Sequence, residues 1–238
     1  MKLHTLVIAA HPDDAELCCA GTVANQIAEG KKVGYIDITQ GELGTRGTPQ
    51  IRDAEAKAAA EILGLSVREN LNLPDGFFRQ DKESLLKVVE KIRQYQPEMV
   101  LTNAISDRHP DHGRGAELVK EACFLSGLRM IETTVEGKQQ QAWRPKQLFH
   151  FIQSNYIQPD IVVDITDAWD IKMKAIKAFK SQFYNPESQE PATFISSEGF
   201  INFIEARARE FGHAIGVTYG EGYTVTKQIG LKRLEDLL

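Results

Sequence analysis

Cysteine, long apolar runs and excess positive charge are all scarce in this 238-residue chain. The three cysteines, Cys18, Cys19 and Cys123, have no C-x-x-C spacing, so we expect neither a disulfide framework nor a thiolate zinc site and interpret them as small buried residues. No apolar run approaches the roughly 18–20 residues that span a bilayer. Lys and Arg number 28 against 33 Asp and Glu, which argues against a nucleic-acid or anionic membrane partner because such surfaces need clustered positive charge.

The start of the chain also lacks the charged, apolar and small-residue segments of a signal peptide, and we therefore expect a cytoplasmic protein. The composition, with 42% hydrophobic and 26% charged residues, is ordinary for a globular protein. No repeat, low-complexity segment or linker divides the chain. We therefore expect one domain over residues 1–238 with a sizeable core.

Apolar strands and amphipathic helices alternate through the first half of the chain. The run Leu3–Ala10 is apolar throughout, which is typical of a central parallel strand covered on both faces. The alternation predicts an α/β fold with a mostly parallel, doubly wound sheet. The expected strands lie at 3–10, 33–39, 70–73 and 99–103, and the expected helices at 15–29, 50–63, 81–95 and about 112–128.

The second half, the C-terminal part, is less regular. Strands are expected at 147–152 and 161–165, and helices at 168–183 and 198–211. The polar stretch 185–197 contains two prolines. We expect it to form a long loop that acts as a lid or a subunit contact.

Two His-Pro-Asp turns each follow a predicted strand, at His11–Asp14 and at His109–His112. Open α/β sheets bind ligands at the carboxyl ends of their strands, so we expect the two turns to form one site. Histidine nitrogen and aspartate oxygen are ordinary zinc ligands, and His11, Asp14 and His112 supply the three that a catalytic zinc typically keeps. Fe²⁺, Mn²⁺ or Co²⁺ would accept the same donors.

The other polar residues of these turns are candidates for catalysis. Asp13 is a candidate general base for a water acidified by the metal. His109, as an imidazolium, is a candidate partner for an oxyanion, and Asp111 is a candidate for holding that ring oriented and charged. Glu16 fits either a favourable charge at a helix start or a supporting role in the site. Either turn alone is also explained as a polar loop with an N-cap aspartate.

Three arginines flank the predicted site. Arg46 lies in the glycine-rich segment 41–47, Arg52 opens the next helix, and Arg108 precedes the second turn. Guanidinium groups bind carboxylates and phosphates bidentately, so these three are candidates for binding an anionic substrate. Each is equally explained as a solvated or ion-paired residue, with Glu55 as the partner of Arg52. The glycine-rich segment lacks both G-x-G-x-x-G and a P-loop lysine, so we do not expect nucleotide binding.

Together these motifs resemble the zinc-dependent N-acetylglucosaminyl deacetylases of the LmbE/PIG-L family. The resemblance is carried by His11–Glu16, Gly41–Gly47 and His109–His112, and the order of motifs agrees along nearly the whole chain. It implies a Rossmann-like domain, zinc on the three ligands named above, Asp13 as general base and then acid, and His109 as the partner of the oxyanion. It also implies a homo-oligomer, often a hexamer.

Within the family, the sequence most resembles the bacillithiol biosynthesis deacetylases, which remove acetate from N-acetylglucosaminyl malate. Phe211–Val217 and the Ser-Asp-Arg lead-in to the second turn support this placement. The expected substrate is a small N-acetylated amino-sugar glycoside, and malate would give Arg52 or Arg108 a dianionic target. Some relatives use a tyrosine as an oxyanion donor, whereas Phe194 has no hydroxyl. Either His109 and zinc carry that role alone, or Tyr184 substitutes.

Three alternatives stay open at this point. In the first, the chain is an enzyme that acts on other N-acetylglucosamine compounds. In the second, it is an enzyme that cleaves thiol S-conjugates at an amide on the cysteine side of the sugar. The third alternative is a sugar- or metal-binding module without turnover. The candidate base and oxyanion partner argue against the third, because binding alone needs neither.

Overall fold

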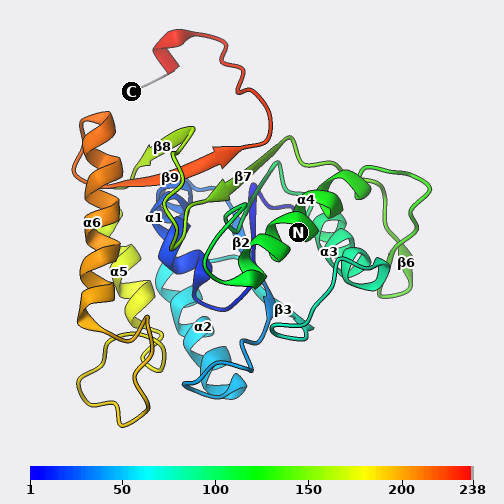
Figure 1. Cartoon of the computed structure of the whole chain (residues 1–238). Coiled ribbons are helices and arrows are strands. Elements are labelled where there is room, and N and C mark those ends of the chain that lie inside the picture. The colour runs from blue at the N-terminus through cyan, green and yellow to red at the C-terminus, as the bar shows by residue number, and fades with distance from the viewer. Residues whose placement is uncertain (237–238) are drawn as a thin grey trace.

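A seven-stranded sheet with the order β3-β2-β1-β4-β7-β9-β8 is the centre of the molecule (Figure 1). The computed structural model describes residues 1–236, so residues 237–238 of the predicted domain lie outside it. The parallel strands are β1 (Thr5–Ala9), β2 (Val33–Thr39), β3 (Val67–Leu73), β4 (Met99–Thr102) and β7 (Gln147–Phe151). β9 (Gly220–Val225) runs antiparallel between β7 and β8 (Ile161–Asp164). β5 (Thr134–Val135) and β6 (Lys138–Gln139) form a separate hairpin.

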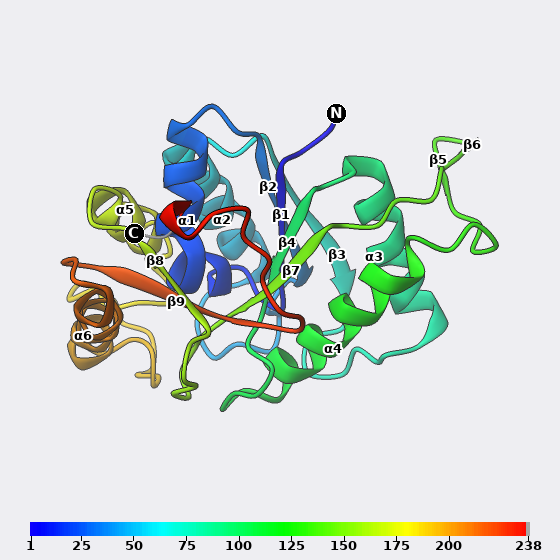
Figure 2. The ribbon, with the colours of Figure 1, turned by 90° about the horizontal axis from the view of Figure 1, so that it is seen from above.

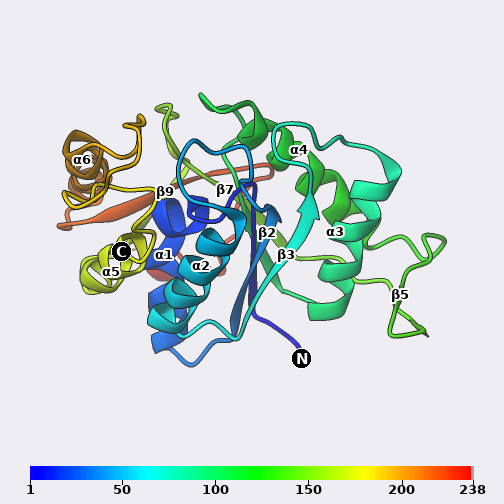
Figure 3. The ribbon, with the colours of Figure 1, turned by 90° about the horizontal axis from the view of Figure 1, so that it is seen from below.

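Helices cover both faces of this sheet (Figures 2 and 3). One face carries α1 (Asp14–Ala28), α2 (Pro49–Leu63) and α5 (Trp169–Lys177). The other face carries α3 (Lys82–Tyr95) and α4 (Pro110–Leu125). α6 (Glu198–Ile215) packs against β9, and a 3-10 helix, Leu234–Asp236, follows near the end of the described chain.

The central strand β1 shows why the sheet needs a cover on each face. Val7 and Ala9 belong to the apolar cluster with α1, α2 and α5, whereas Leu6 and Ile8 belong to the cluster with α3 and α4. Side chains alternate between the faces of a strand, so a run that is apolar throughout requires burial on both sides. The predicted α/β fold with a mostly parallel, doubly wound sheet is therefore confirmed.

The strand β9 is the member of the seven-stranded sheet that the sequence analysis missed. Its sequence contains two glycines, which are poor strand formers. It is held by antiparallel pairing to β7 and β8, which lie far from it in sequence. Its position in the sheet therefore depends on tertiary pairing.

The bounds of several predicted elements also differ from those observed. The helix predicted over 168–183 ends at Lys177, although the buried Phe179 and Phe183 continue the apolar pattern in turns. Apolar spacing indicates which side chains are buried, and side chains in turns can be buried as well as those in a helix. The apolar pattern therefore extends beyond the helix itself. The helix predicted over 198–211 continues to Ile215. Gly216 follows it with a φ of 81°, and a glycine in this left-handed conformation commonly ends a helix.

The strand order also decides where a ligand can bind. β1 lies between β2 and β4; α1, which follows β1, covers one face, and α4, which follows β4, covers the other. The carboxyl ends of β1 and β4 therefore border the topological switch point, where doubly wound sheets bind their ligands. Within residues 1–236, no helix is long and apolar enough to cross a membrane.

Candidate active site

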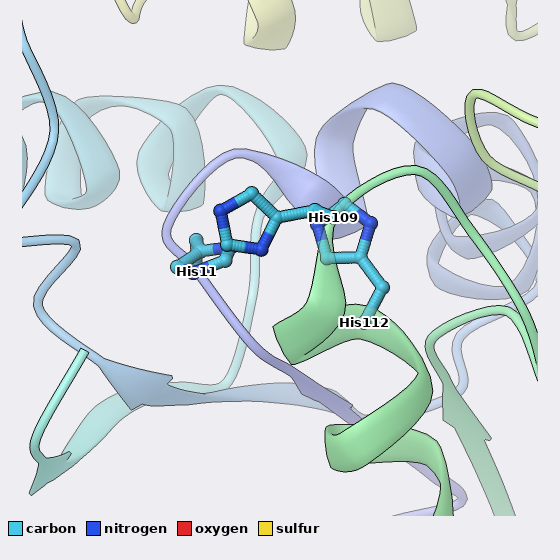
Figure 4. Close-up of side chains that lie close together, drawn as sticks. All are labelled: His11, His109 and His112. Carbon is cyan, nitrogen blue, oxygen red and sulfur yellow. The ribbon is translucent and has the colours of Figure 1, made fainter. Parts of the chain in front are cut away.

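The two His-Pro-Asp turns meet at this switch point, as the sequence predicted (Figure 4). The ring centroids of His11 and His109 are 4.7 Å apart, those of His11 and His112 5.5 Å, and those of His109 and His112 5.1 Å. One ring nitrogen of each histidine lies within 4.8 Å of the other two. The turns therefore form a single cluster of imidazoles.

Asp14 lies between two of these imidazoles. Its carboxylate oxygens are 3.5 Å from His11 Nδ1 and 3.1 Å from His112 Nε2. The side-chain amides of Asn103 and Gln153 each donate to the same carboxylate at 3.0 Å. Burial raises the pKa of Asp14, but the charge on His112 and the hydrogen bond from His11 outweigh it, so the pKa lies well below its usual range.

Other carboxylates hold the opposite nitrogen of each of these two rings. Asp107 is 2.6 Å from His112 Nδ1, while Asp75 and Asp111 are 3.1 and 3.4 Å from His11 Nε2. A carboxylate on one imidazole nitrogen fixes the tautomer and turns the other nitrogen toward a metal. His11 Nδ1, His112 Nε2 and the Asp14 carboxylate between them are thus a donor set that fits a divalent cation.

A second group with ligand spacing consists of His11, Asp75 and Asp111, whose candidate atoms lie within 4.8 Å of one another. Asp111 also accepts the backbone N–H of Gly76 at 2.7 Å and pairs with Arg114. Asp75 accepts a backbone N–H from the glycine-rich segment at 3.0 Å. Both carboxylates lie at His11 Nε2, whereas Asp14 lies at His11 Nδ1, so we assign Asp75 and Asp111 to orienting His11.

Asp13 occupies a strained position at the start of α1. Its φ of 115° is rare for a residue with a side chain and costs about 1–3 kcal/mol. It stands at the N-cap, yet its side chain makes no capping hydrogen bond and instead accepts from Arg52 Nη2 at 3.0 Å. Burial raises the pKa of Asp13 to about 7 against the opposing effect of the Arg52 charge. The N-cap interpretation therefore does not explain this aspartate.

His109 does cap its helix, because its Nδ1 accepts the backbone N–H of Asp111 at 3.2 Å. Burial lowers the pKa of His109, and the charges on His11 and His112 lower it further. These effects act against the imidazolium that the sequence analysis expected, and a neutral ring whose Nδ1 accepts a hydrogen bond carries its proton on Nε2. The role of His109 at an oxyanion stays a prediction. The predicted contact with the Asp111 carboxylate is corrected, since that group lies 3.4 Å from His11 Nε2.

Of the three predicted arginines, Arg108 is the one that lies exposed on the wall of the cavity in front of the histidines. Its guanidinium carbon is 4.5 Å from the centroid of the Phe194 ring. Phe194 belongs to the predicted long loop, which is observed as a loop between α5 and α6. Tyr184 does not line the cavity. Its proposed replacement of a tyrosine donor therefore has no structural support.

The other two arginines are engaged by the protein. Arg52 lines the cavity but is buried, and besides Asp13 it donates to the carbonyl oxygens of Pro12 at 2.6 Å and Gly41 at 3.1 Å. Its alternative partner, Glu55, instead accepts hydrogen bonds from Ser181. Arg46 is buried, donates to Ser188 and does not line the cavity. Neither guanidinium is free to bind a substrate anion in this arrangement.

Glu16 lies in the first turn of α1, where a negative charge is favourable, as one of its two interpretations expected. It is fully buried and pairs with Arg68, which also donates to Asp37 at 3.0 Å. Burial raises the pKa of Glu16, and the charge on Arg68 opposes this effect. Glu16 does not line the cavity. It belongs to a buried ion-pair network that supports the first helix.

Four residues of the site escaped the sequence analysis as site residues: Asp75, Asn103, Asp107 and Gln153. Each follows β3, β4 or β7 within a few residues. They therefore lie at the same edge of the sheet as both His-Pro-Asp turns. The rule that located the turns would also have located these residues, had it been applied to every strand.

The fold and the site together define an α/β enzyme with donors for a divalent metal ion. The family model described as PIG-L, GlcNAc-PI de-N-acetylase, matches residues 6–123. Together with a relative at 31% identity, this match shows that the chain belongs to the PIG-L family.

Several relatives extend the similarity over most of the chain. It is 31% identical over 193 residues to 4-oxalmesaconate hydratase of Pseudomonas putida, covering 74% of this chain and 73% of the relative. It is 27% identical over 231 residues to diacetylchitobiose deacetylase of Thermococcus kodakarensis, with coverage of 91% and 80%. It is 29% identical over 199 residues to probable N-acetyl-alpha-D-glucosaminyl L-malate deacetylase 2 of Bacillus subtilis, with coverage of 76% and 84%. The crystal structure of a conserved protein from Thermus thermophilus superimposes with a TM-score of 0.85 at 34% identity, covering 98% of both chains.

Proposed function

We propose that this enzyme hydrolyses the acetamide of an N-acetylated amino sugar with the help of a divalent cation held by His11, Asp14 and His112. The observation that carries this proposal is the Asp14 carboxylate, 3.5 Å and 3.1 Å from one nitrogen of each ring. Membership of the deacetylase family supports the reaction class. When bound, such a cation supplies a Lewis acid and lowers the pKa of water to about 7. Zinc is our first candidate, and Fe²⁺, Mn²⁺ and Co²⁺ are alternatives.

Asp13 is the proposed general base and acid of the reaction. Its carboxylate takes a proton from the attacking water as the carbon–oxygen bond forms, and returns it to the sugar nitrogen as the amide bond breaks. The products are acetate and the free amine. Arg52, 3.0 Å away, holds this carboxylate in place. The Nε2–H of neutral His109 is the proposed donor to the carbonyl oxygen as negative charge develops there.

The proposed substrate in its specific form is N-acetylglucosaminyl malate. Arg108 lines the cavity and contacts the Phe194 ring, and no carboxylate pairs with its guanidinium within residues 1–236. It is therefore available for a malate carboxylate. The name of the Bacillus subtilis relative supports the same glycoside.

A second candidate function is hydration of an unsaturated carboxylic acid. It is favoured by the 31% identity with a protein named 4-oxalmesaconate hydratase. A general base beside a cation and a free arginine would serve that chemistry as well. The two candidates differ in the bond that water attacks, so product analysis separates them.

The test uses the full-length protein loaded in turn with each of the four cations. We expect acetate release from N-acetylglucosaminyl malate, and slower release from N,N′-diacetylchitobiose. Release from diacetylchitobiose alone would reject malate and retain the reaction class. Consumption of 4-oxalmesaconate without release of acetate from either sugar would overturn the proposal in favour of the hydratase.

Three further expectations from the sequence stay predictions: a single domain, a homo-oligomer that is often a hexamer, and a cytoplasmic location. Light scattering after size-exclusion chromatography measures the second of these directly.

A further inference from the structure

One face of α6 lines the cavity that contains the proposed catalytic residues. The spacing of three and four residues places the lining side chains on one side of the helix. Five of the six are apolar. They span twelve residues, and the eleven steps of 1.5 Å between the first and the last make a wall roughly 16 Å long. The lining residues of α6 are Phe200, Phe203, Ile204, Arg207, Ala208 and Phe211.

Neighbouring elements continue this apolar wall up to the reacting centre. Leu17 and Cys18 of α1 line the same cavity, as do Ile152 after β7 and Ile195 in the loop before α6. Leu17 and Cys18 lie one helical turn beyond Asp14. The apolar lining therefore begins beside the proposed metal ligands and extends away from them along α6.

Two charged residues that line this part of the cavity, Lys172 and Arg207, are already engaged by the protein. Lys172 Nζ is 2.7 Å from Glu221 Oε1, and both side chains are buried. Arg207 donates to the backbone carbonyl oxygens of Gln153 and Ser154 at 3.1 and 3.4 Å. An apolar group placed beside these two residues would leave neither charge unpaired, and unpaired charge is the usual cost of burying an apolar group near ionised residues. Arg108 of the same cavity is exposed and keeps its contact with water.

The cavity is also large enough to hold a conjugate together with its N-acetyl group. Its volume is about 380 Å³, within the range of pockets that hold drug-sized ligands. An N-acetylated sugar offers one methyl group as its apolar part, whereas the wall extends over several turns of α6.

We propose that the enzyme binds amino-sugar conjugates that carry an extended apolar substituent, and that this substituent lies along the α6 wall. The inference rests on the proposed function, because the substituent is bound beside the same reacting amide. The apolar substituent belongs to one of two parts of the substrate, the aglycone or the acyl group of the amide. An apolar aglycone would replace malate in the substrate, whereas an apolar acyl group in place of acetyl would be compatible with malate.

Two series of compounds separate these sources, each used below its critical micelle concentration. One series keeps the N-acetyl group and lengthens the aglycone from methyl to butyl and octyl. The other keeps a methyl aglycone and lengthens the acyl group from acetyl to butanoyl and octanoyl. In one series we expect kcat/KM to rise by about fourfold per buried methylene until the wall ends. Flat profiles in both series would overturn the proposal.

A matched pair of variants on α6 tests where the substituent lies. Ala208→Leu fills the cavity, whereas Ala206→Leu adds the same atoms at an exposed position of the same helix. We expect Ala208→Leu to lower the ratio of kcat/KM for octyl or octanoyl over the short compound by at least about fivefold, and Ala206→Leu to preserve it. Equal ratios in both variants would place the substituent elsewhere. If Ala208→Leu does not fold, Phe203→Ala is the second variant, and it should lower the same ratio.

Calorimetric binding of the same compounds to the metal-free protein distinguishes failure of this inference from failure of the proposed function. Affinity that increases with chain length, without turnover of any compound, would uphold the apolar wall and reject the reaction. Turnover of the short compounds, without any gain from chain length in affinity or kcat/KM, would uphold the reaction and reject the wall.

Discussion

Changing Asp13 and Asp14 separately to asparagine tests how the site divides its chemistry. Both residues are buried and adjacent, so each substitution removes one negative charge and nearly preserves shape. We expect Asp13→Asn to retain the cation and to lower kcat by about 10²–10⁴-fold, the usual contribution of general acid–base catalysis. We expect Asp14→Asn to lose the cation, because its carboxylate lies 3.5 Å from His11 Nδ1 and 3.1 Å from His112 Nε2.

Arg52 decides how much stability the Asp13→Asn variant loses. Its guanidinium loses a carboxylate at 3.0 Å but keeps the carbonyl oxygens of Pro12 at 2.6 Å and Gly41 at 3.1 Å. Removing one partner of a buried ion pair costs about 3–5 kcal/mol when the remaining charge has no other partner. With two carbonyls retained, and because the neutral amide removes the burial cost that raises the pKa of Asp13 to about 7, we expect a loss of at most about 1–3 kcal/mol. The variant should therefore remain folded.

The assay combines metal content by mass spectrometry, kcat at saturating substrate and cation, and the free energy of unfolding from urea titrations. Parallel loss of cation and activity in Asp13→Asn would make Asp13 a ligand and refute the division of roles. Unchanged cation affinity in Asp14→Asn would refute the ligand set.

Three further predictions concern the surroundings of the site and the core. Asp107→Asn should weaken cation affinity by about 10–100-fold, because Asp107 orients His112 from 2.6 Å; competition with a chelator measures this, and an unchanged affinity would speak against it. Arg108→Gln should raise KM for N-acetylglucosaminyl malate by about tenfold relative to KM for an uncharged N-acetylglucosaminide. Equal rises for both glycosides would exclude a contact with malate. Burial raises the pKa of the Cys123 thiol to about 12, so roughly one molecule in ten thousand carries the thiolate at pH 8. Iodoacetamide should then label Cys123 only after unfolding, and labelling of the folded protein in peptide mass spectra would contradict this.

Patterns within short stretches of sequence determined much of the fold. The helix predicted over 81–95 is observed as α3, and Asp81 caps it by accepting the backbone N–H of Ser84. Helix periodicity, caps and the apolar run of a covered strand are all local properties, so the sequence displays them directly. The meeting of the two His-Pro-Asp turns was predictable for the same reason, because parallel strands bring their carboxyl ends to one edge.

Only the tertiary structure decided which partner each polar group takes. Asp14 accepts from Gln153, 139 positions away in the chain, and β9 enters the sheet between two strands that precede it by tens of residues. Arg52 pairs with Asp13 rather than Glu55, and the Asp111 carboxylate lies at His11 rather than His109. Spacing along the chain shows which charges are available, but a buried charge pairs with whichever group the packed elements bring within reach.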